Sequence, residues 1–452
     1  MVTPVINPLL TPLAKERIAF LLHSEHWSKE EHEAYQLAQL KELLTYCDEH
    51  VPFYQQLFKK YRFDPRAVRA VNAIKALPFL TKKDIQSKYD EFIPQGIKKE
   101  NLIHRSTGGS TGTPLTVYAD LDFLARDKAN TVYYMQIAGF NPFDFKSIRL
   151  YGDKIPQDLV SSKQFWFEKD NKLIVSCYHF AQEHFPLYVE AINRYQPDYI
   201  HSRASAIYPL SQYICQHPDA LKINVGAVYL DGEFLNDAQR DVIEKAWGCR
   251  VYNIYGHTEG CTVGISCNHS RLLHFMPQVG ILELLDDQGQ EVTQEGAVGE
   301  MVVTGFNNRV FPLIRYRTFD MAINTQQKCA CQRNYRMIKS LEGRMQDFVI
   351  NKSAKAIPLA PAVFNYNDMD WQGIRQFQVE QQQVGVLNFK VVRETSCQES
   401  ASSMKDRIIQ AFNKIFNNTF DINLEFVDDI ARTRIGKFRY LEQRLDVTRY
   451  LS

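Results

Sequence analysis

The chain has 452 residues, which allows two or three domains with a substantial core. Its 53 lysines and arginines nearly balance its 52 aspartates and glutamates, so its charge favours neither nucleic acid nor an acidic membrane surface as a partner. No apolar run approaches the roughly 20 residues of a membrane helix, and the first residues lack the pattern of a signal peptide. The nine cysteines, most of them isolated, favour a reduced, cytoplasmic protein.

Taken in chain order, the first predicted elements are helices, because residues 31–61 carry apolar side chains at helical spacing. Short β-like runs follow, and helical stretches such as "NDAQRDVIEKAW" separate several of them. This alternation predicts a parallel sheet with crossover helices. The runs are "PLTVYA" (114–119), "SIRLYG" (147–152), "DYIHS" (198–202), "GAVYL" (226–230) and "RVYNIYG" (250–256).

The pattern of apolar and polar residues changes at residues 278–305. Two apolar runs there flank a turn signal at Asp286, Asp287, Gln288 and Gly289, which predicts an antiparallel β module. Beyond "LEGRMQDFVI", two strand-like runs and an amphipathic helix predict a small α+β domain. The fold class is therefore α/β, with a large N-terminal domain over residues 1–343 and a small C-terminal domain over residues 344–452.

A loop rich in glycine and hydroxyl groups lies within "HRSTGGSTGTPLTVY", at residues 104–118. Backbone N–H and side-chain O–H groups of such a loop can converge on phosphate oxygens. A Walker loop would place Gly-Lys-Ser/Thr at its end, whereas Thr113 and Pro114 stand here, so a P-loop NTPase is excluded. Taken alone, the loop could equally be a surface turn. Its candidate phosphate-binding residues are Ser106, Thr107, Gly108, Gly109, Ser110, Thr111 and Gly112.

Further motifs follow this loop in a fixed order, and together they resemble the adenylate-forming superfamily of acyl-CoA synthetases, luciferases and adenylation domains. They are "LDGEFL" (230–235), "NIYGHTEG" (253–260), "IRYRTFDMA" (314–322), "LEGRMQDFV" (341–349) and "ARTRIGKFRYL" (431–441). The segments "VPFYQQLF" (51–58) and "LPFLTKKDI" (77–85) are similar to those of phenylacetate–CoA ligases and their capsular-polysaccharide-biosynthesis-type relatives. The resemblance implies a mobile C-terminal domain.

The resemblance also implies which residues bind ATP and Mg²⁺. Thr258 would contact the α-phosphate, Glu259 would hold the magnesium ion, and Lys437 would bridge the carboxylate and the α-phosphate. Tyr255 and Asp320 would bind the adenine and the ribose hydroxyls. A carboxylate suits the ribose, because its two oxygens accept two hydrogen bonds. Further nucleotide-binding positions implied in the same way are Gly232, Glu233, Gly256 and Arg344.

The implied reaction joins a carboxylic acid to AMP with release of pyrophosphate, and then transfers the acyl group to a thiol, most simply that of coenzyme A. Two alternatives stay open: transfer to a carrier-protein thiol or an amine, and a non-catalytic nucleotide-binding protein. The hinge position carries the neutral Gln346, which leaves the second half-reaction open. The acid itself cannot be read from the sequence. Its pocket is predicted, by position relative to the motifs, to be bordered by Tyr151, Gly152, Leu230, His257 and Thr262.

Two cysteine-containing segments suggest a metal site. "CNHSRLLH" contributes Cys267 and His274, and "KCACQR" contributes Cys329 and Cys331. Three thiolates and one imidazole form a tetrahedral zinc set with no open position, which would make the metal structural. Comparable patterns occur in some relatives of the phenylacetate–CoA ligase group. The alternative is that the four side chains bind nothing.

A homodimer is predicted from the apolar segment at residues 51–58. Its aromatic side chains, Phe53, Tyr54 and Phe58, are expected to leave apolar surface that a partner subunit covers.

Overall fold

The structure is a computed structural model. It describes residues 11–106, 115–140, 145–179, 182–344, 348–359, 372–394, 397–431 and 439–450. The chain forms two compact units. The first combines Met1–Phe145 with Tyr252–Ser340, and the second combines Lys146–Val251 with Leu341–Ser452. The predicted domain boundary between residues 343 and 344 stays a prediction. No helix in the described part of the chain is long and apolar enough to span a membrane.

Two long helices of the first unit begin with side-chain caps. Ser28 and Glu31 form a capping box at the start of α2, and the Asp120 side chain caps α5. The predicted helical stretch at 31–61 divides at Val51, because the following Pro52 removes a backbone donor and disfavours helical geometry in the residue before it. The helices are α1 Pro12–Ser24, α2 Lys29–His50, α3 Pro52–Tyr61, η2 Pro65–Ala67, η3 Val71–Ala76, α4 Lys82–Ser87, η4 Tyr89–Phe92, η5 Lys99–Asn101 and α5 Leu121–Ile137.

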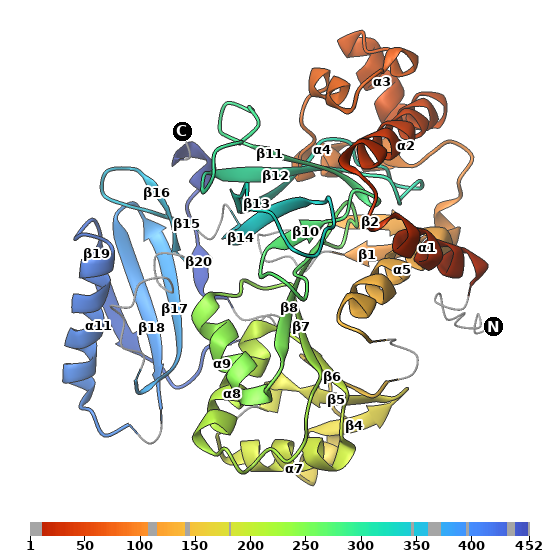
Figure 1. The fold of residues 1–452 in the computed structure, drawn as a ribbon. Helices are drawn as coiled ribbons and strands as arrows, with labels where there is room; N and C mark the ends of the chain where they lie inside the picture. Colours follow the sequence, from red (N-terminus) through yellow and green to blue (C-terminus); the bar gives the residue numbers. More distant parts are fainter. Residues whose placement is uncertain are drawn as a thin grey trace. The chain divides into compact units, whose positions relative to one another are not determined.

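The sheet of the first unit runs in the order β11-β12-β13-β14-β10-β9-β8 (Figure 1). The pairs β11–β12, β12–β13, β14–β10, β10–β9 and β9–β8 are antiparallel. The predicted turn is confirmed: Gly289 has φ +72° and donates to the Asp286 carbonyl between β11 and the residues leading to β12. The strands are β8 Arg250–Gly256, β9 Val263–Ile265, β10 Leu273–Phe275, β11 Gly280–Leu285, β12 Val298–Gly305, β13 Tyr316–Asn324 and β14 Arg336–Arg344. A separate hairpin pairs β1 Ile103–Ser106 with β2 Thr116–Ala119.

The second unit contains the predicted parallel sheet, in the order β7-β6-β3-β5-β4, in which only β4 is antiparallel to its neighbour. Helix α9 begins with a capping box at Asn236 and Gln239 and ends at Gly248, which has φ +64°. The elements are β3 Ser147–Tyr151, α6 Gln157–Ser161, β4 Trp166–Lys169, β5 Lys172–Ser176, η6 Cys177–His179, η7 Gln182–His184, α7 Phe185–Tyr195, β6 Tyr199–Ser202, α8 Ala204–Gln216, β7 Ala227–Asp231 and α9 Asp237–Trp247.

The C-terminal part of this unit has the predicted strands and helix. Its sheet runs β19-β18-β17-β20, and the buried face of α11 packs with apolar strand residues such as Val379 and Phe389 (Figure 1). The hairpin β15–β16 precedes it. The elements are β15 Phe348–Ile350, β16 Ala356–Pro358, β17 Ile374–Gln383, β18 Val386–Arg393, α11 Ala401–Ile415, β19 Asp421–Phe426, β20 Leu441–Gln443 and η9 Val447–Tyr450.

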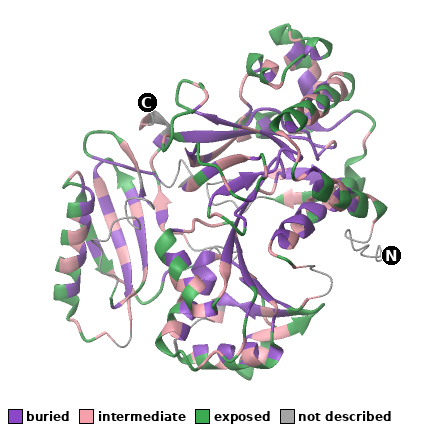
Figure 2. Ribbon diagram, in the orientation of Figure 1, coloured by how far each residue is buried: buried purple, intermediate pink, exposed green. Residues whose placement is uncertain are grey.

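The aromatic segment of α3 belongs to the core of its own chain. Phe53, Tyr54 and Phe58 are buried with residues of η4 and with Phe311, and the central strands of the same unit are buried as well (Figure 2). The Tyr54 hydroxyl also donates to the Pro312 carbonyl. The observation that motivated the homodimer is therefore explained within one chain, and the homodimer stays a prediction without that support.

Candidate active site and metal cluster

The strands β1 and β2 flank the glycine-rich segment in the sequence and pair with each other. Ser106 at the end of β1 pairs with Thr116 at the start of β2, and their hydroxyl oxygens lie 2.8 Å apart. The remaining candidate phosphate-binding residues, Thr107, Gly108, Gly109, Ser110, Thr111 and Gly112, lie outside the described residues.

The motif at residues 253–260 begins on strand β8. Tyr255 lies near the end of this strand, and the Tyr255 hydroxyl donates to Oδ2 of Asp320 over 2.6 Å. Asp320 comes from β13, 65 residues further along the chain, and both side chains are buried. The structure therefore brings together the two residues for which the sequence predicted adenine and ribose binding. Gly256 is exposed and Thr258 is partly exposed.

Glu259 is buried, and each of its oxygens has a partner. Oε1 accepts from the Tyr316 hydroxyl over 2.9 Å, and Oε2 lies 3.1 Å from Nδ1 of His257. Burial alone would raise the pKa of Glu259, but the interactions with His257 and the hydrogen bond from Tyr316 lower it to about 2. The side chain is therefore a carboxylate at neutral pH, as a magnesium ligand must be. Thr262, predicted to border the acid pocket, is also buried.

Gly260 explains how the chain turns directly after this carboxylate. It has φ +68°, and a Cβ atom built on it would lie 2.4 Å from the ring of Phe123. Any side chain here would be strained in its backbone and would collide with a buried aromatic ring of α5. Glycine thus lets the motif pass close to α5 while Glu259 stays buried.

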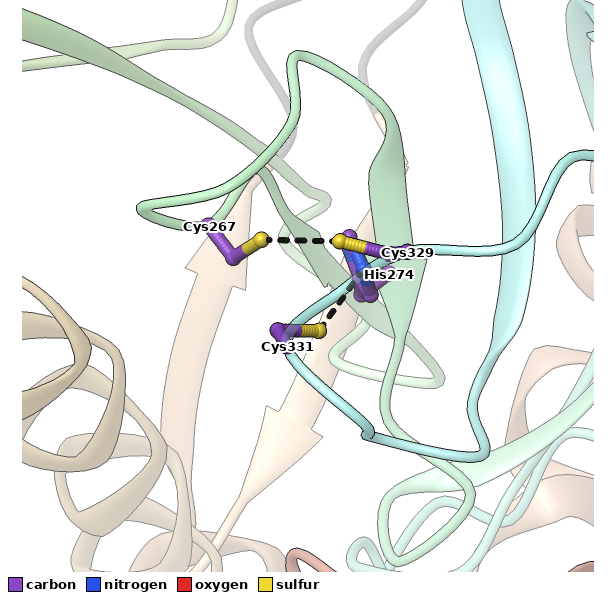
Figure 3. Close-up of side chains that lie close together, drawn as sticks. All are labelled: Cys267, His274, Cys329 and Cys331. Atoms are coloured by element: carbon purple, nitrogen blue, oxygen red, sulfur yellow. Dashed lines mark hydrogen bonds between the residues drawn. The ribbon is translucent and has the colours of Figure 1, made fainter.

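Cys267, His274, Cys329 and Cys331 come together in the first unit (Figure 3). Their ligand atoms all lie within 4.8 Å of one another. The Cys267 and Cys329 sulfurs are 3.4 Å apart, and the Cys331 sulfur is 3.3 Å from Nε2 of His274. Hydrogen bonds from Cys331 and His274 and from the His269 backbone lower the pKa of Cys267.

This cluster fits a tetrahedral zinc ion. Zn–S bonds of about 2.3 Å at tetrahedral angles place sulfurs roughly 3.8 Å apart, close to the spacing observed here. Nδ1 of His274 lies 3.0 Å from the Leu272 carbonyl, to which it can donate, and this leaves Nε2 as the ligand atom on the side of Cys331. The cluster is nearly closed to solvent, since three of the four residues are buried.

The predicted site residues of the second unit follow the carboxyl ends of parallel strands. Tyr151 ends β3, Gly152 comes directly after it, and Leu230 lies next to the end of β7. Gly232 has φ +68°, and both carboxylate oxygens of Glu233 accept from Ser205, one from its backbone N–H and one from its hydroxyl. Lys437 and Gln346 lie outside the described residues, and Arg344 is the last residue of β14.

Several polar residues at these strand ends were not predicted from the sequence. The Tyr151 hydroxyl donates to Oδ1 of Asp231 over 2.9 Å, and Nε2 of His201 lies 3.2 Å from Oδ2 of the same carboxylate. Burial would raise the pKa of Asp231, but hydrogen bonding and charge interaction with His201 and the hydrogen bond from Tyr151 lower it. The sequence signal that could have indicated these residues is the alternation of polar and apolar side chains near the strand end, as at His201 and Arg203.

Comparison with known proteins agrees with this architecture. The chain is 28% identical over 415 residues to protein CapK of Staphylococcus aureus, covering 88% of this chain and 86% of CapK. It is 26% identical to a phenylacetate–coenzyme A ligase of Thermus thermophilus, covering 73% of this chain and 74% of the relative. Residues 361–444 match the family described as the CapK C-terminal domain.

Among solved structures, a 2-hydroxyisobutyryl-CoA ligase in complex with 2-HIB-AMP superposes with a TM-score of 0.72. The match covers 95% of this chain and 93% of the ligase at 18% identity, and it shows a shared fold. CapK and the phenylacetate–coenzyme A ligases are thus homologues of this chain, and the chain shares the fold of the 2-hydroxyisobutyryl-CoA ligase.

Proposed function

We propose that this protein activates a carboxylic acid with ATP, forms an acyl-adenylate with release of pyrophosphate, and transfers the acyl group to coenzyme A. The observation that carries the proposal is the buried arrangement of Glu259, Tyr255 and Asp320, which gathers a charged carboxylate and a tyrosine–aspartate pair from β8 and β13. Homology to phenylacetate–coenzyme A ligases supports coenzyme A as the acceptor. We place the reaction in the cytoplasm, where the nine free thiols would stay reduced.

The proposed roles follow from the charge that develops in the reaction. Attack of a carboxylate on the α-phosphate spreads negative charge over phosphate oxygens, so cations and preorganised donors lower the barrier. Glu259 would hold Mg²⁺, which supplies positive charge to these oxygens when bound. Thr258 would donate to the α-phosphate, and Lys437 would bridge it to the acid as a compact point charge.

The residues around the nucleotide would fix its position. Tyr255 would lie against the adenine, and Asp320 would accept from the ribose hydroxyls. Gly232 and Glu233 are further proposed nucleotide-binding residues. In the structure Asp320 already accepts from Tyr255, so the tyrosine would orient the carboxylate that meets the ribose. Gly256 and Arg344 would complete this part of the site, and residues 106–112 would surround the leaving pyrophosphate.

A second acceptor is favoured by one observation, the likeness to CapK over 88% of this chain. In this alternative the acyl group passes from the adenylate to a carrier-protein thiol or to an amine. Both candidates share the adenylation step and differ only in the second half-reaction.

Pyrophosphate release over a panel of carboxylic acids tests the shared step, and trapping with hydroxylamine identifies the activated acid. Adding coenzyme A then separates the two candidates, because only the first yields a free thioester. Lys437→Ala should lower the adenylation rate by orders of magnitude while ATP still binds, since each ~1.4 kcal/mol of lost transition-state stabilisation is tenfold in rate. An unimpaired rate in this variant would remove the assigned role.

We also propose that Cys267, His274, Cys329 and Cys331 hold a structural zinc ion. The donor set and spacing support it, and four protein ligands would leave no position for a reacting water. The ion would join the loop after β9 to the loop after β13 and would contribute directly to stability.

Elemental analysis of protein purified without chelator should find about one zinc per chain, as expected for a four-ligand site. Cys329→Ser combined with Cys331→Ser should abolish the metal and lower the melting temperature. The matched control, Cys215→Ser with Cys397→Ser, removes two thiols outside the cluster and should retain the zinc. Fully stable wild-type protein without any bound transition metal would show that the four residues are not a metal site.

A further inference from the structure

In the second unit, polar side chains lie on one face of the parallel sheet at the carboxyl ends of β3, β6 and β7. Arg149, His201 and Tyr229 pair across the three strands. Side chains two residues apart in a strand lie on the same face, so Tyr151 on β3 and Asp231 on β7 continue this row, and Arg203 follows directly after β6. The opposite face carries Leu150 and Leu230, which belong to the hydrophobic core.

Direct contacts tie this face together. Asp231 accepts from Tyr151 and from His201 through its two different oxygens. The guanidinium groups of Arg149 and Arg203 lie 4.3 and 5.0 Å from the centre of the Tyr151 ring. Arg149 also forms an ion pair with Asp153. The donors and acceptors on this face are therefore held in place by one another, unlike isolated charged side chains on a protein surface.

Solvent, and therefore a ligand, can reach the face. The side chain of Asp231 is 36% exposed and that of His201 is 27% exposed, although both are held in place by hydrogen bonds. Ligands of parallel α/β sheets bind at the carboxyl ends of the strands, which is where this face lies. Asp231 also directly precedes Gly232 and Glu233, the segment assigned above to the nucleotide.

The charged groups on the face indicate what kind of group it would bind. Two arginines, Arg149 and Arg203, stand beside two aspartates, Asp153 and Asp231, and His201 contacts Asp231, so charges of both signs would act on a second carboxylate or an ammonium group. Each oxygen of Asp231 uses one lone pair on Tyr151 or His201 and has another with which to accept. A hydroxyl group, which both donates and accepts, suits such a mixed surface.

We propose that this polar face recognises a hydroxyl group on the acid substrate, and that the enzyme therefore prefers hydroxylated carboxylic acids to their deoxy counterparts. The proposal rests on the function proposed above and adds the chemical class of its substrate. Asp231 would accept from the substrate hydroxyl, and Tyr151 and His201 would hold the carboxylate in position. A site built to hydrogen-bond a hydroxyl discriminates against the analogue that lacks it, because its own polar groups then stay unpaired.

The test compares matched acids that differ by hydroxyl groups: lactate with propionate, mandelate with phenylacetate, and gluconate with hexanoate. Pyrophosphate release gives kcat/KM for each acid, and calorimetry measures binding of the same acids to the full chain without turnover. Wild-type protein should favour the hydroxylated member of at least one pair by about 10- to 100-fold, the range for a hydrogen bond to a charged group.

Two variants assign this preference to the face. Asp231→Asn and Tyr151→Phe preserve size, and each should raise KM and Kd for the hydroxylated acid about tenfold or more relative to those for its deoxy partner. The control is Asp198→Asn, the same change at the opposite end of β6, where the carboxylate accepts from the Lys146 backbone. It should leave the preference intact.

The outcomes separate this inference from the proposed function. If no acid releases pyrophosphate, the proposed function fails, and the binding measurements still judge the polar face. The inference is overturned if wild-type protein binds neither member of any pair, if it uses deoxy acids equally well, or if the variants weaken both members of a pair alike. A variant that loses only melting temperature would show that the face has a purely structural role.

Discussion

Two buried carboxylates of the first unit, Glu283 and Glu259, differ in their partners. Glu283 on β11 receives two hydrogen bonds from the guanidinium of Arg315, over 2.9 and 3.1 Å. Arg315 also donates to the Lys75 and Leu77 carbonyls. Both carboxylate oxygens and all three guanidinium nitrogens therefore have hydrogen-bond partners inside the protein. The pair joins the segment before β1 to the sheet.

Glu259 is equally buried, but its partners are the Tyr316 phenol and the His257 imidazole. Among the described residues it forms no ion pair with an arginine or a lysine. A buried carboxylate usually requires a partner of opposite charge, because desolvation otherwise favours its neutral form. The contrast teaches that burial alone does not mark a functional acid. An arginine that satisfies the carboxylate completely marks a structural one, whereas a carboxylate held by a phenol and an imidazole keeps lone pairs with which to bind a cation.

The largest expected effect would come from breaking the structural pair. Arg315→Ala leaves Glu283 buried and charged without a partner, which should lower the free energy of unfolding by about 3–5 kcal/mol. Urea denaturation measures this loss. The control is Arg66→Ala, since Arg66 also meets two acids, Asp48 and Glu49, but with its side chain 60% exposed. There the expected loss is at most about 1 kcal/mol, and equal losses in the two variants would contradict the comparison.

Glu259→Gln should affect catalysis more than stability. The amide keeps the size of the side chain but removes the charge that would hold Mg²⁺, so pyrophosphate release should fall by about 100- to 1,000-fold. Because the pKa of Glu259 is about 2, the native carboxylate stays charged throughout the usual assay range, and an acid limb of the pH–rate profile above pH 4 must come from another group.

Glu283→Gln makes the same change at the structural carboxylate. It should lower the melting temperature while the folded enzyme keeps its rate of pyrophosphate release. If instead Glu259→Gln retained the wild-type rate, or if Glu283→Gln reduced the rate of folded protein as strongly, the distinction between the two carboxylates would be wrong.

The parts of the fold that the sequence predicted are those with local signals. The helical stretch at residues 236–247, the turn at Asp286–Gly289 and the strand runs at 147–152, 198–202 and 226–230 each depend on neighbours within a few residues, and all are confirmed. The run at 114–119 was wrongly assigned to the parallel sheet, because β2 pairs antiparallel with β1 in a separate hairpin, and the run at 250–256 forms β8, which pairs antiparallel with β9. The proximity of four candidate ligands was predicted for a related reason: they form two close pairs in the sequence, Cys267 with His274 and Cys329 with Cys331, and each pair follows a recognisable motif.

Contacts between distant segments were not predictable in this way. Arg315 and Leu77 are 238 residues apart, and the bond between Tyr316 and Glu259 spans 57 residues. The polar face at Asp231 arises only when three separate strands align in register. Such pairings depend on the packing of the whole unit, and composition or periodicity within one segment contains no information about them.

The smallest expected effect tests the neutral partner of Glu259. Tyr316→Phe removes one hydrogen bond to the carboxylate, worth roughly 1 kcal/mol, so pyrophosphate release should fall about fivefold and the concentration of Mg²⁺ required for half-maximal rate should change. The control is Tyr54→Phe, which removes another buried hydroxyl of the same unit, one that contacts the Pro312 carbonyl and the Ile314 N–H. That change should lower the melting temperature and leave the Mg²⁺ dependence as it was. If Tyr316→Phe instead changed stability alone, like Tyr54→Phe, the phenol would be one more packing contact, and Glu259 would depend on His257 by itself.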